Sequence, residues 1–318
     1  MIGTDIQHAK NLLEAGELVA IPTETVYGLA ANAYNDKAVS EIFRVKNRPS
    51  FDPLIVHVGR WEQVAEFVVE IPEQAQHLAA RFMPGPLTLL LPKNERLSDI
   101  VTAGSPQVAV RMPNHYLTQQ LLHLLSFPLA APSANPFGYI SPTTARHVAD
   151  QLDEQVPYIL DGGACTIGIE STILGFENGT PTIYRKGGLT IEMIEDAIGP
   201  VAVKPYSTSQ PQAPGMLQSH YAPRIPLKIG AIGELLSAFE PNRTGVLAFR
   251  RKVPVVPAAN QVVLSKNGDF AEAARNLFAG MRYLDGLDLD VILAEPVPEM
   301  GLGRAINDRL RRAAAQEG

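Results

Sequence analysis

The sequence of 318 residues contains one cysteine, Cys165, and one tryptophan. A single thiol excludes an internal disulfide framework and a cysteine-based zinc site, which needs several thiolates. No apolar run approaches the ~20 residues that a membrane-spanning helix needs. Residues 1–5 lack the basic region and apolar core that begin a secretory signal. These absences favour a protein of the reducing cytoplasm that does not span a membrane.

Positive charge is scarce over most of the chain. Residues 1–203 carry 13 Lys and Arg against 22 Asp and Glu, whereas residues 204–318 carry 14 against 11, which gives net charges of −9 and +3. A nucleic-acid-binding surface needs clustered positive charge, so direct RNA binding is disfavoured. The composition, 46% hydrophobic and 19% charged, is that of a globular protein.

The length and the distribution of proline indicate two domains. A chain of 318 residues exceeds the size at which single cores usually stop growing. Prolines crowd the segment 200–226, where they interrupt any helix or central strand. The sign of the net charge changes at the same place. We therefore predict a domain over residues 1–203, a proline-rich linker over 204–224 and a second domain over 225–318.

Hydrophobic patterning predicts an α/β fold for both domains. In the first, several apolar strands follow one another directly, which indicates a mixed sheet with helices. The expected strands there are 18–21, 54–58, 87–91, 108–110, 158–160, 171–176 and 182–185, with helices at about 6–16 and 36–46. The second domain alternates more regularly and predicts a small three-layer α/β domain with a mostly parallel sheet. Its expected strands are 227–229, 245–249, 262–264 and 291–294, with helices at about 233–239, 270–283 and 302–315.

Familiar catalytic motifs are missing. The chain has no Gly-x-Ser-x-Gly elbow and no His-Glu-x-x-His metal helix. It also has no Walker-type phosphate loop, so an ATP site would have to use a different cradle.

Polar segments at the ends of predicted strands are the candidates for function, because binding residues concentrate in loops held by a scaffold. Residues 22–29, PTETVYGL, either bind a small polar ligand or form a structural turn. Arg111 ends an apolar strand and must reach water or an anion, for which a ligand carboxylate or a protein Asp or Glu are the natural partners. Residues 131–136, APSANP, suit a phosphate or ribose, or a simple turn.

For Lys46 and Arg48, too, a role in binding has to be weighed against a purely structural one. A cation at the end of a helix commonly serves only as a partner of the helix dipole, so Lys46 alone indicates little. Arg48 precedes a proline, which favours extended backbone, and its guanidinium can bind phosphate oxygens in bidentate fashion. His57 lies on an apolar strand, where a histidine satisfied within the core is the simpler interpretation.

Taken in order, these segments resemble the Sua5/YwlC branch of the YrdC family, the threonylcarbamoyl-AMP synthases. The matching segments are PTETVYGL (22–29), KNRP and PLIVH (46–57), PGPLT (84–88), VAVRMP (108–113), APSAN (131–135), DGG to ESTI (161–173) and PGM to HYAP (214–223). The resemblance implies a curved, mixed α/β sheet that encloses a basic cavity. It also implies a small Rossmann-like Sua5 domain after the linker.

The resemblance further implies which residues bind the substrates. Around L-threonine it places Thr25, His57, Arg111, Ala131 and Ser171. Around ATP it places Arg48, Asp52, Ser133, Asn135, Ser141, Arg185 and Tyr221. Lys46 and Arg48 are the expected catalytic cations, and Tyr221 would act from the linker as part of a lid.

The implied reaction makes L-threonylcarbamoyladenylate from L-threonine, bicarbonate or CO2, and ATP, with release of pyrophosphate. Mg²⁺ is the expected metal ion, and the sequence does not identify its ligands. The product would pass to a tRNA threonylcarbamoyl-transfer complex that forms N6-threonylcarbamoyladenosine. Three positions depart from the family pattern: Asn47 replaces a usual Gly or Ala, Ser219 replaces a usual basic residue, and Asp52 replaces a usual Asn.

Three other functions fit parts of the sequence. A non-enzymatic RNA-binding module with a YrdC-like fold would use the cavity as a basic groove, but the acidic first domain disfavours it. A carbamoyltransferase of the hydrogenase-maturation type adds cysteine-rich zinc modules, which one cysteine excludes. A purely structural protein would leave the polar segments as turns.

Overall fold

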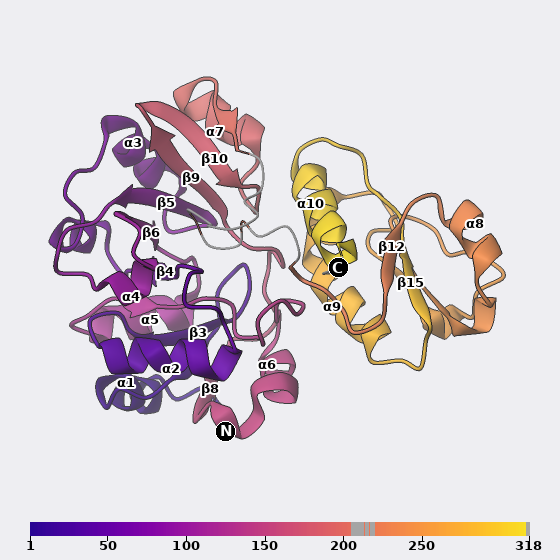
Figure 1. Ribbon diagram of the computed structural model, residues 1–318, viewed down its shortest axis with the longest axis horizontal. Coiled ribbons are helices and arrows are strands. Elements are labelled where there is room, and N and C mark those ends of the chain that lie inside the picture. The colour runs from indigo at the N-terminus through magenta and orange to yellow at the C-terminus, as the bar shows by residue number, and fades with distance from the viewer. Residues whose placement is uncertain (205–212, 214–215, 217–219, 316–318) are drawn as a thin grey trace. The chain divides into compact units, whose positions relative to one another are not determined.

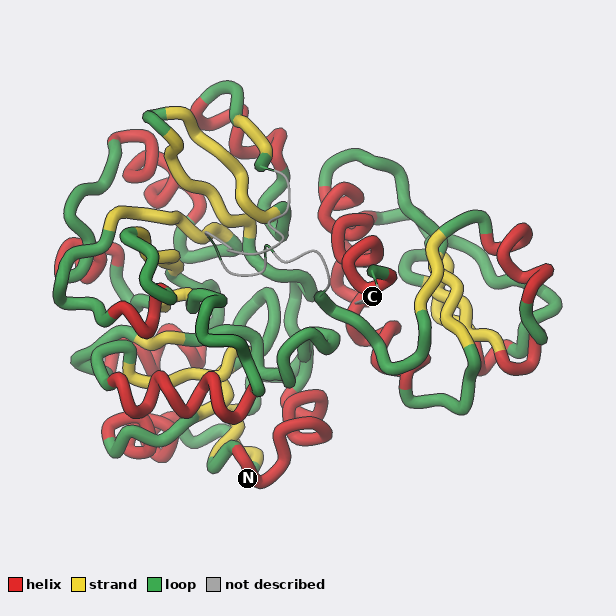
Figure 2. Tube along the Cα trace, viewed as in Figure 1, coloured by secondary structure: helices red, strands yellow, loops and turns green. Residues whose placement is uncertain are grey.

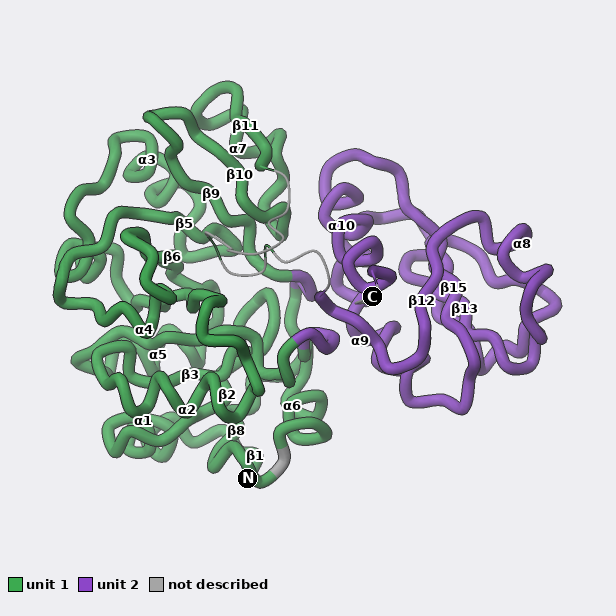
Figure 3. Tube along the Cα trace, in the orientation of Figure 1, with its two compact units in different colours: residues 1–137, 142–166, 170–217 green, residues 138–141, 167–169, 218–318 purple. Residues whose placement is uncertain are grey.

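The computed structural model describes residues 1–204, 213, 216 and 220–315. The chain folds into two compact units, drawn in different colours in Figure 3. Unit 1 comprises residues 1–137, 142–166 and 170–217, and unit 2 comprises residues 138–141, 167–169 and 218–318. Most of the predicted linker lies outside the described residues, so the domain boundaries at 203 and 225 stay predictions.

Unit 1 is built on one sheet of 11 strands within the described residues, ordered β1-β8-β2-β3-β7-β4-β6-β5-β9-β10-β11. Its strands β5, β9 and β10 lie side by side in Figure 1. Parallel and antiparallel neighbours alternate irregularly, since β4 pairs with β6 in parallel and β6 with β5 in antiparallel. The mixed sheet expected from the sequence is therefore confirmed. The strands are β1 (Ile2–Gly3), β2 (Val19–Ile21), β3 (Gly28–Asn32), β4 (Ile55–His57), β5 (Leu87–Pro92), β6 (Gln107–Arg111), β7 (Leu129–Ala130), β8 (Tyr158–Leu160), β9 (Thr172–Glu177), β10 (Thr180–Arg185) and β11 (Ala202–Val203).

In unit 1 the helices lie around the outside of the sheet (Figure 2). They are α1 (Ile6–Glu14), α2 (Asp36–Lys46), α3 (Glu73–Phe82), α4 (Asp99–Thr102), α5 (Tyr116–Leu124), α6 (Ala145–Leu152) and α7 (Ile191–Ile198), with 3-10 turns η1 (Trp61–Glu66) and η2 (Asp153–Gln155). Buried side chains of α2, α3, α4, α6 and α7 form one large core with alternate residues of the strands. Because strand side chains alternate between faces, the remaining strand residues point to the opposite face.

The opposite face has two separate apolar clusters. Toward β2 and β8, residues of α1 and α5 cover the sheet, with Leu13 and Leu121 fully buried. Toward β9 and β10, the linker residues Ala213 and Met216 pack against Ile55, Leu90, Ala109, Ile173 and Tyr184. Polar side chains near the ends of the central strands lie outside both clusters and form the candidate site described below.

Helix α2 shows how the sequence sets the local geometry. Its N-cap is Asn35, whose side chain accepts hydrogen bonds from the N–H groups of Lys37 and Ala38. Its C-cap is Asn47, which has left-handed backbone angles of φ 51° and ψ 41°. Asparagine tolerates this conformation better than most residues, which accounts for the departure from Gly or Ala there.

Unit 2 is a second α/β fold. Its four strands are β12 (Leu227–Ile229), β13 (Thr244–Ala248), β14 (Gln261–Val263) and β15 (Val291–Ala294), all pairing in parallel in the order β12-β15-β13-β14. This confirms the expected parallel sheet. The helices are α8 (Ile232–Leu235), α9 (Phe270–Asp285) and α10 (Leu302–Ala314), with 3-10 turns η3 (Leu236–Ala238), η4 (Pro241–Arg243) and η5 (Ala258–Asn260). None of the helices described is both long and apolar enough to cross a membrane.

Candidate functional site

A row of polar side chains crosses the centre of the unit 1 sheet. The strand registers place His57 of β4 beside Arg111 of β6, and Arg111 beside Thr88 of β5. The row continues through Ile173 of β9 to Arg185 of β10. Five strands, drawn from residues 55 to 185, thus bring two arginines, a histidine and a hydroxyl onto one line. Of the four, only Thr88 was absent from the predicted site residues.

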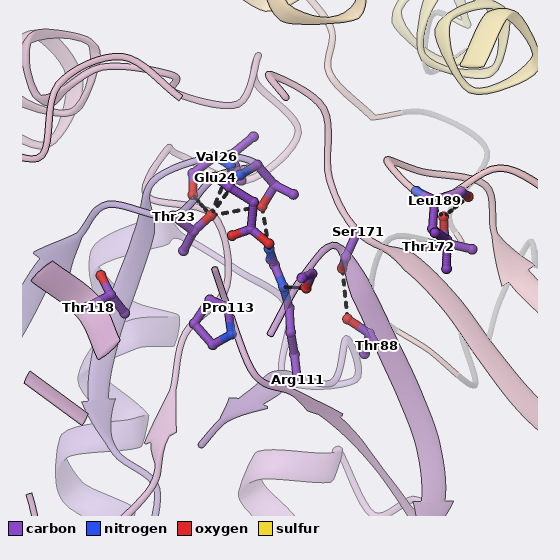
Figure 4. A network of polar contacts seen from close by, with 12 residues as sticks. Thr23, Glu24, Val26, Thr88, Arg111, Pro113, Thr118, Ser171, Thr172 and Leu189 are labelled. Carbon is purple, nitrogen blue, oxygen red and sulfur yellow. Dashed lines mark hydrogen bonds and ion pairs between the residues drawn. The ribbon is translucent and has the colours of Figure 1, made fainter. Parts of the chain in front are cut away.

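Arg111 is the centre of this row and is only 3% exposed. Its Nη1 donates to Thr25 Oγ1 over 2.9 Å, and its Nε donates to the Gly85 carbonyl over 3.3 Å. Its Nη2 lies 2.8 Å from Glu24 Oε1 in a buried ion pair (Figure 4). Of the partners that the sequence allowed, this structure therefore provides the protein carboxylate. Sequence reasoning missed Glu24, because the hydroxyls of the surrounding threonines were the evident signal in PTETVYGL.

A compact turn presents Glu24 and Thr25 to Arg111. Thr23 Oγ1 accepts hydrogen bonds from the N–H groups of Thr25 and Val26 and donates to the Val26 carbonyl over 2.7 Å. It also lies 2.8 Å from Thr25 Oγ1. The turn that the sequence left as an alternative is thus present, and it orients two polar side chains toward a buried cation.

Ser171 joins the other end of the row. Its Oγ lies 2.7 Å from Thr88 Oγ1 and accepts a hydrogen bond from Arg185 Nη2 over 3.0 Å. Arg185 Nε also donates to the Ser171 carbonyl. Ser171 and Arg185 were predicted to contact different substrates, threonine and ATP respectively. Their direct contact brings those two predicted subsites into one network.

Lys46 holds the APSAN loop (131–135) through two hydrogen bonds. It is 1% exposed, and its Nζ donates to the carbonyls of Ser133 and Asn135 over 2.5 Å in each case. The loop in turn pairs with the sheet, because Ala131 N–H donates to the Ile55 carbonyl and Ser133 bridges Gly28. Burial, and then the nearby charge of Arg48, lowers the pKa of Lys46 well below its ordinary value. The charge of Asp52 opposes this shift only in part, so a cation buried here would gain from a bound anion.

Arg48 and Asp52 form a buried ion pair. Arg48 Nη2 lies 2.9 Å from Asp52 Oδ2, and the side chains are 4% and 0% exposed. The guanidinium also donates to the carbonyls of Asp52 and Pro53. Part of its hydrogen-bonding capacity therefore stabilises the loop that follows α2. Asp52 acts here as a partner of Arg48, which gives the departure from Asn at this position a physical reason.

His57 is buried beside Arg111. Burial, and then the charge of Arg111, lowers the pKa of His57 to about 3, so its imidazole is neutral at pH 7. Its Nδ1 has no hydrogen-bond partner within the described part of the chain. A neutral imidazole with an unused nitrogen fits a binding role better than the satisfied core histidine that the strand pattern favoured.

The lowered pKa of His57 predicts an acid-dependent loss of stability. The unfolded chain binds a proton at His57 below pH ~6.5 and the folded chain only near pH 3, so stability falls as the pH drops between these values. Between pH 7 and pH 5 this group is expected to contribute a loss of about 2 kcal/mol. His57→Gln should lack that contribution. Urea unfolding at both pH values, followed by the fluorescence of the single tryptophan Trp61, measures it.

His77→Gln is the matched control, because His77 is exposed on α3. This variant should lose as much stability between pH 7 and pH 5 as the parent chain. An equal loss in His57→Gln and the parent chain would contradict the assignment.

Ser141 and Tyr221, both predicted to bind ATP, belong to unit 2. Tyr221 has a left-handed φ of 64°, which is uncommon for a residue with a side chain. Its ring packs against Phe278, with the guanidinium carbons of Arg309 and Arg312 at 5.1 and 4.7 Å from the ring centroid. Unit 2 therefore fixes the conformation of Tyr221. Contact of Ser141 and Tyr221 with a nucleotide stays a prediction.

The groove, the potential metal ligands and the cysteine of the chain do not carry the predicted chemistry. A groove of about 740 Å³ is lined by residues at the start of α1 and along α5, and no predicted site residue lines it. Among the described residues, no three His, Cys, Asp or Glu side chains gather in a way that could hold a metal ion. Cys165 is buried, and burial raises the pKa of its thiol to about 12, which opposes a nucleophilic role.

Comparison with known proteins identifies both parts of the chain. Residues 11–187 match the Sua5/YciO/YrdC family model, described as telomere recombination. Residues 189–315 match the model of the threonylcarbamoyl-AMP synthase C-terminal domain. The threonylcarbamoyl-AMP synthase of Pyrococcus abyssi is 42% identical over 97% of this chain and 94% of its own. That of Bacillus subtilis is 43% identical over 97% and 92%.

Solved structures agree with these matches. The crystal structure of P. abyssi Sua5 complexed with L-threonine has a TM-score of 0.91 at 42% identity and covers 97% of this chain and 94% of that one. Escherichia coli YciO, at 19% identity and a TM-score of 0.51 over 59% of this chain, shows the fold alone. The resemblance and the YrdC-like and Sua5 folds expected from the sequence are confirmed. The chain belongs to the threonylcarbamoyl-AMP synthases, a family of nucleotidyl-transferring enzymes, in the form that carries a Sua5 domain.

Proposed function

We propose that this protein makes L-threonylcarbamoyladenylate from L-threonine, bicarbonate or CO2, and ATP, and releases pyrophosphate. The product would supply a tRNA threonylcarbamoyl-transfer complex that forms N6-threonylcarbamoyladenosine. The observation that carries the proposal is the buried Arg111, held by Thr25 and Glu24 at the centre of a polar row across five strands. The P. abyssi relative is described as complexed with L-threonine, which supports an amino acid as one substrate.

Arg111 and its neighbours suit an amino acid. A guanidinium binds a carboxylate with two parallel hydrogen bonds, and burial strengthens those bonds. The hydroxyls of Thr25 and Ser171 and the neutral imidazole of His57 supply uncharged donors and acceptors. Such groups can bind the hydroxyl of threonine and leave apolar amino acids at a disadvantage.

The cations Lys46, Arg48 and Arg185 suit the triphosphate. All three are less than 9% exposed, and positive charge in a dry site stabilises the pyrophosphate that leaves. Ser133 and Asn135, whose carbonyls bind Lys46, would contact the nucleotide. Mg²⁺ commonly binds through substrate phosphates and few protein carboxylates, so the donor set here fits an ion that arrives with ATP. Such an ion would neutralise charge on the phosphates.

The proposed chemistry needs no protein nucleophile. Threonine binds as the ammonium form and first loses one proton to the solvent; the neutral amine then attacks the carbon of CO2 and loses a second proton, which gives an N-carboxylate. An oxygen of this carboxylate attacks the α-phosphorus of ATP, and the bond from that phosphorus to the bridging oxygen breaks. The protein would contribute orientation and positive charge, which account for large rate effects in such reactions.

The direct test measures pyrophosphate release with ATP, L-threonine and bicarbonate, and with each left out in turn. Release should require all three, and mass spectrometry should find threonylcarbamoyladenylate. Pyrophosphate release without threonine, or none with all three, would contradict the proposal.

Tyr221→Ala tests the proposed lid. The variant should bind ATP several-fold more weakly and release the labile adenylate faster, because an aromatic cover over the nucleotide is lost. Equilibrium titration with ATP and the ratio of trapped product to pyrophosphate measure the two effects. Tyr283→Ala, an exposed tyrosine on α9, is the control. Parent-like values for Tyr221→Ala would reject the lid.

A further inference from the structure

We propose that Glu24 binds the ammonium group of the amino acid and makes the site selective for a zwitterion over a plain carboxylic acid. This inference rests on the proposed function and deepens it, because it assigns the second charge of the substrate. Glu24 was not among the residues that the sequence or the family resemblance pointed to.

The carboxylate of Glu24 is buried and only partly used. The residue is 5% exposed, and its Oε1 forms the 2.8 Å ion pair with Arg111. Neither carboxylate oxygen accepts a well-aligned hydrogen bond from the described residues, and the shortest contact of the ion pair is made by Oε1. A buried carboxylate normally accepts several hydrogen bonds, so this carboxylate has capacity for a donor from outside the chain.

Glu24 is not needed to form the turn that carries it. The hydrogen bonds of the turn go to Thr23 Oγ1, from the N–H groups of Thr25 and Val26. In Figure 4 the Glu24 side chain extends from this turn toward the guanidinium of Arg111. Its position therefore serves the site rather than the local fold.

The charges of the Glu24–Arg111 pair match those of an amino acid. A zwitterion can place its carboxylate on Arg111 and its ammonium on Glu24, so that opposite charges alternate. An acid without the amino group would bring a second carboxylate beside the buried Glu24, where like charges repel strongly. The pair thus selects for an amino group by opposing ligands that lack one.

Calorimetric titration with two ligands tests this assignment. L-Threonine is compared with (3R)-3-hydroxybutanoate, which has the same carboxylate and hydroxyl but no amino group. The parent chain should bind L-threonine at least 30-fold more tightly than the analogue. In Glu24→Gln, L-threonine should bind at least 10-fold more weakly, while the analogue should bind as well as before or better.

The ratio of the two affinities separates recognition from simple positioning. If Glu24 only orients Arg111, Glu24→Gln weakens both ligands equally and the ratio is unchanged, which overturns the proposal. Glu73→Gln, an exposed glutamate at the start of α3, is the matched control. If Glu24→Gln does not fold, the parent chain alone decides, because comparable binding of both ligands contradicts the proposal.

The pyrophosphate assay on the parent chain keeps this inference apart from the proposed function. Threonine-dependent release together with an unchanged affinity ratio in Glu24→Gln refutes the role of Glu24 alone. If the parent chain neither binds L-threonine nor releases pyrophosphate with it, both the proposed function and this inference are refuted.

Discussion

Lys46→Met is expected to lower pyrophosphate release by about 10²–10³-fold, the range found when one preorganised electrostatic group is removed from an active site. Two effects combine. The variant loses a buried positive charge that would face the phosphates. It also loses the two hydrogen bonds that hold the carbonyls of Ser133 and Asn135. Steady-state pyrophosphate release at saturating ATP, threonine and bicarbonate measures the loss.

Lys37→Met is the matched control, because Lys37 lies on the same helix and is exposed. It should keep the parent turnover. Lys46→Arg keeps the charge, but a planar guanidinium does not fit two carbonyls that accept from one ammonium nitrogen. We expect it to recover little of the activity. Parent-like turnover in Lys46→Met would show that this lysine only holds the loop.

Lys46 also illustrates what the sequence could and could not predict. A cation at the end of a predicted helix indicated either a dipole partner or a phosphate ligand. Its partners in the structure are carbonyls of a loop almost ninety residues further along the chain. Helix α2 itself was predictable from the spacing of its apolar residues. The position of the APSAN loop beside it depends on the pairing of nonlocal strands, which local patterns do not specify.

The polar row shows the same division between local and nonlocal information. Arg111 was found because a charged residue at the end of an apolar strand needs a partner, whereas His57 was pointed to only by the family resemblance. Thr88 was missed because a threonine is a common residue in a buried strand. Only the register of β5 with β6 places it beside Arg111. Glu24 was missed for a related reason, since nothing near it in the sequence indicates its ion pair. Short motifs therefore predict which segments matter better than they predict which side chains meet.

The positions of the helices and strands were predicted more accurately for unit 2 than for unit 1. All four strands and the helices α9 and α10 fall within one or two residues of expectation. The sequence Asp269-Phe-Ala-Glu272 at the start of α9 has the pattern of a capping box, but only half of that box is present. Asp269 accepts from the Glu272 N–H, but the Asp269 N–H donates to Ser265 Oγ, which also donates to the Glu272 carboxylate. Ser265, four residues before Asp269, thus takes the place of the direct bond between the Glu272 carboxylate and the Asp269 N–H. The motif alone does not predict this arrangement.

Arg111→Met is expected to lower the catalytic efficiency with threonine by about 10²–10³-fold, from the loss of a buried bidentate contact to a carboxylate. The single change also leaves Glu24 as a buried charge without its ion-pair partner, which destabilises proteins by about 3–5 kcal/mol. A loss of activity alone would therefore not distinguish lost recognition from lost folding. Urea unfolding and threonine titration have to be measured on the same preparations.

The double variant Glu24→Gln/Arg111→Met separates the two effects. It removes both charges, so it should recover much of the stability lost in Arg111→Met. It should not recover threonine binding, because neither charge of the zwitterion has a partner in the site. Arg44→Met, at a 63% exposed side chain on α2, controls for the loss of an arginine. If the double variant regains both stability and threonine affinity, the carboxylate of the substrate binds somewhere other than Arg111.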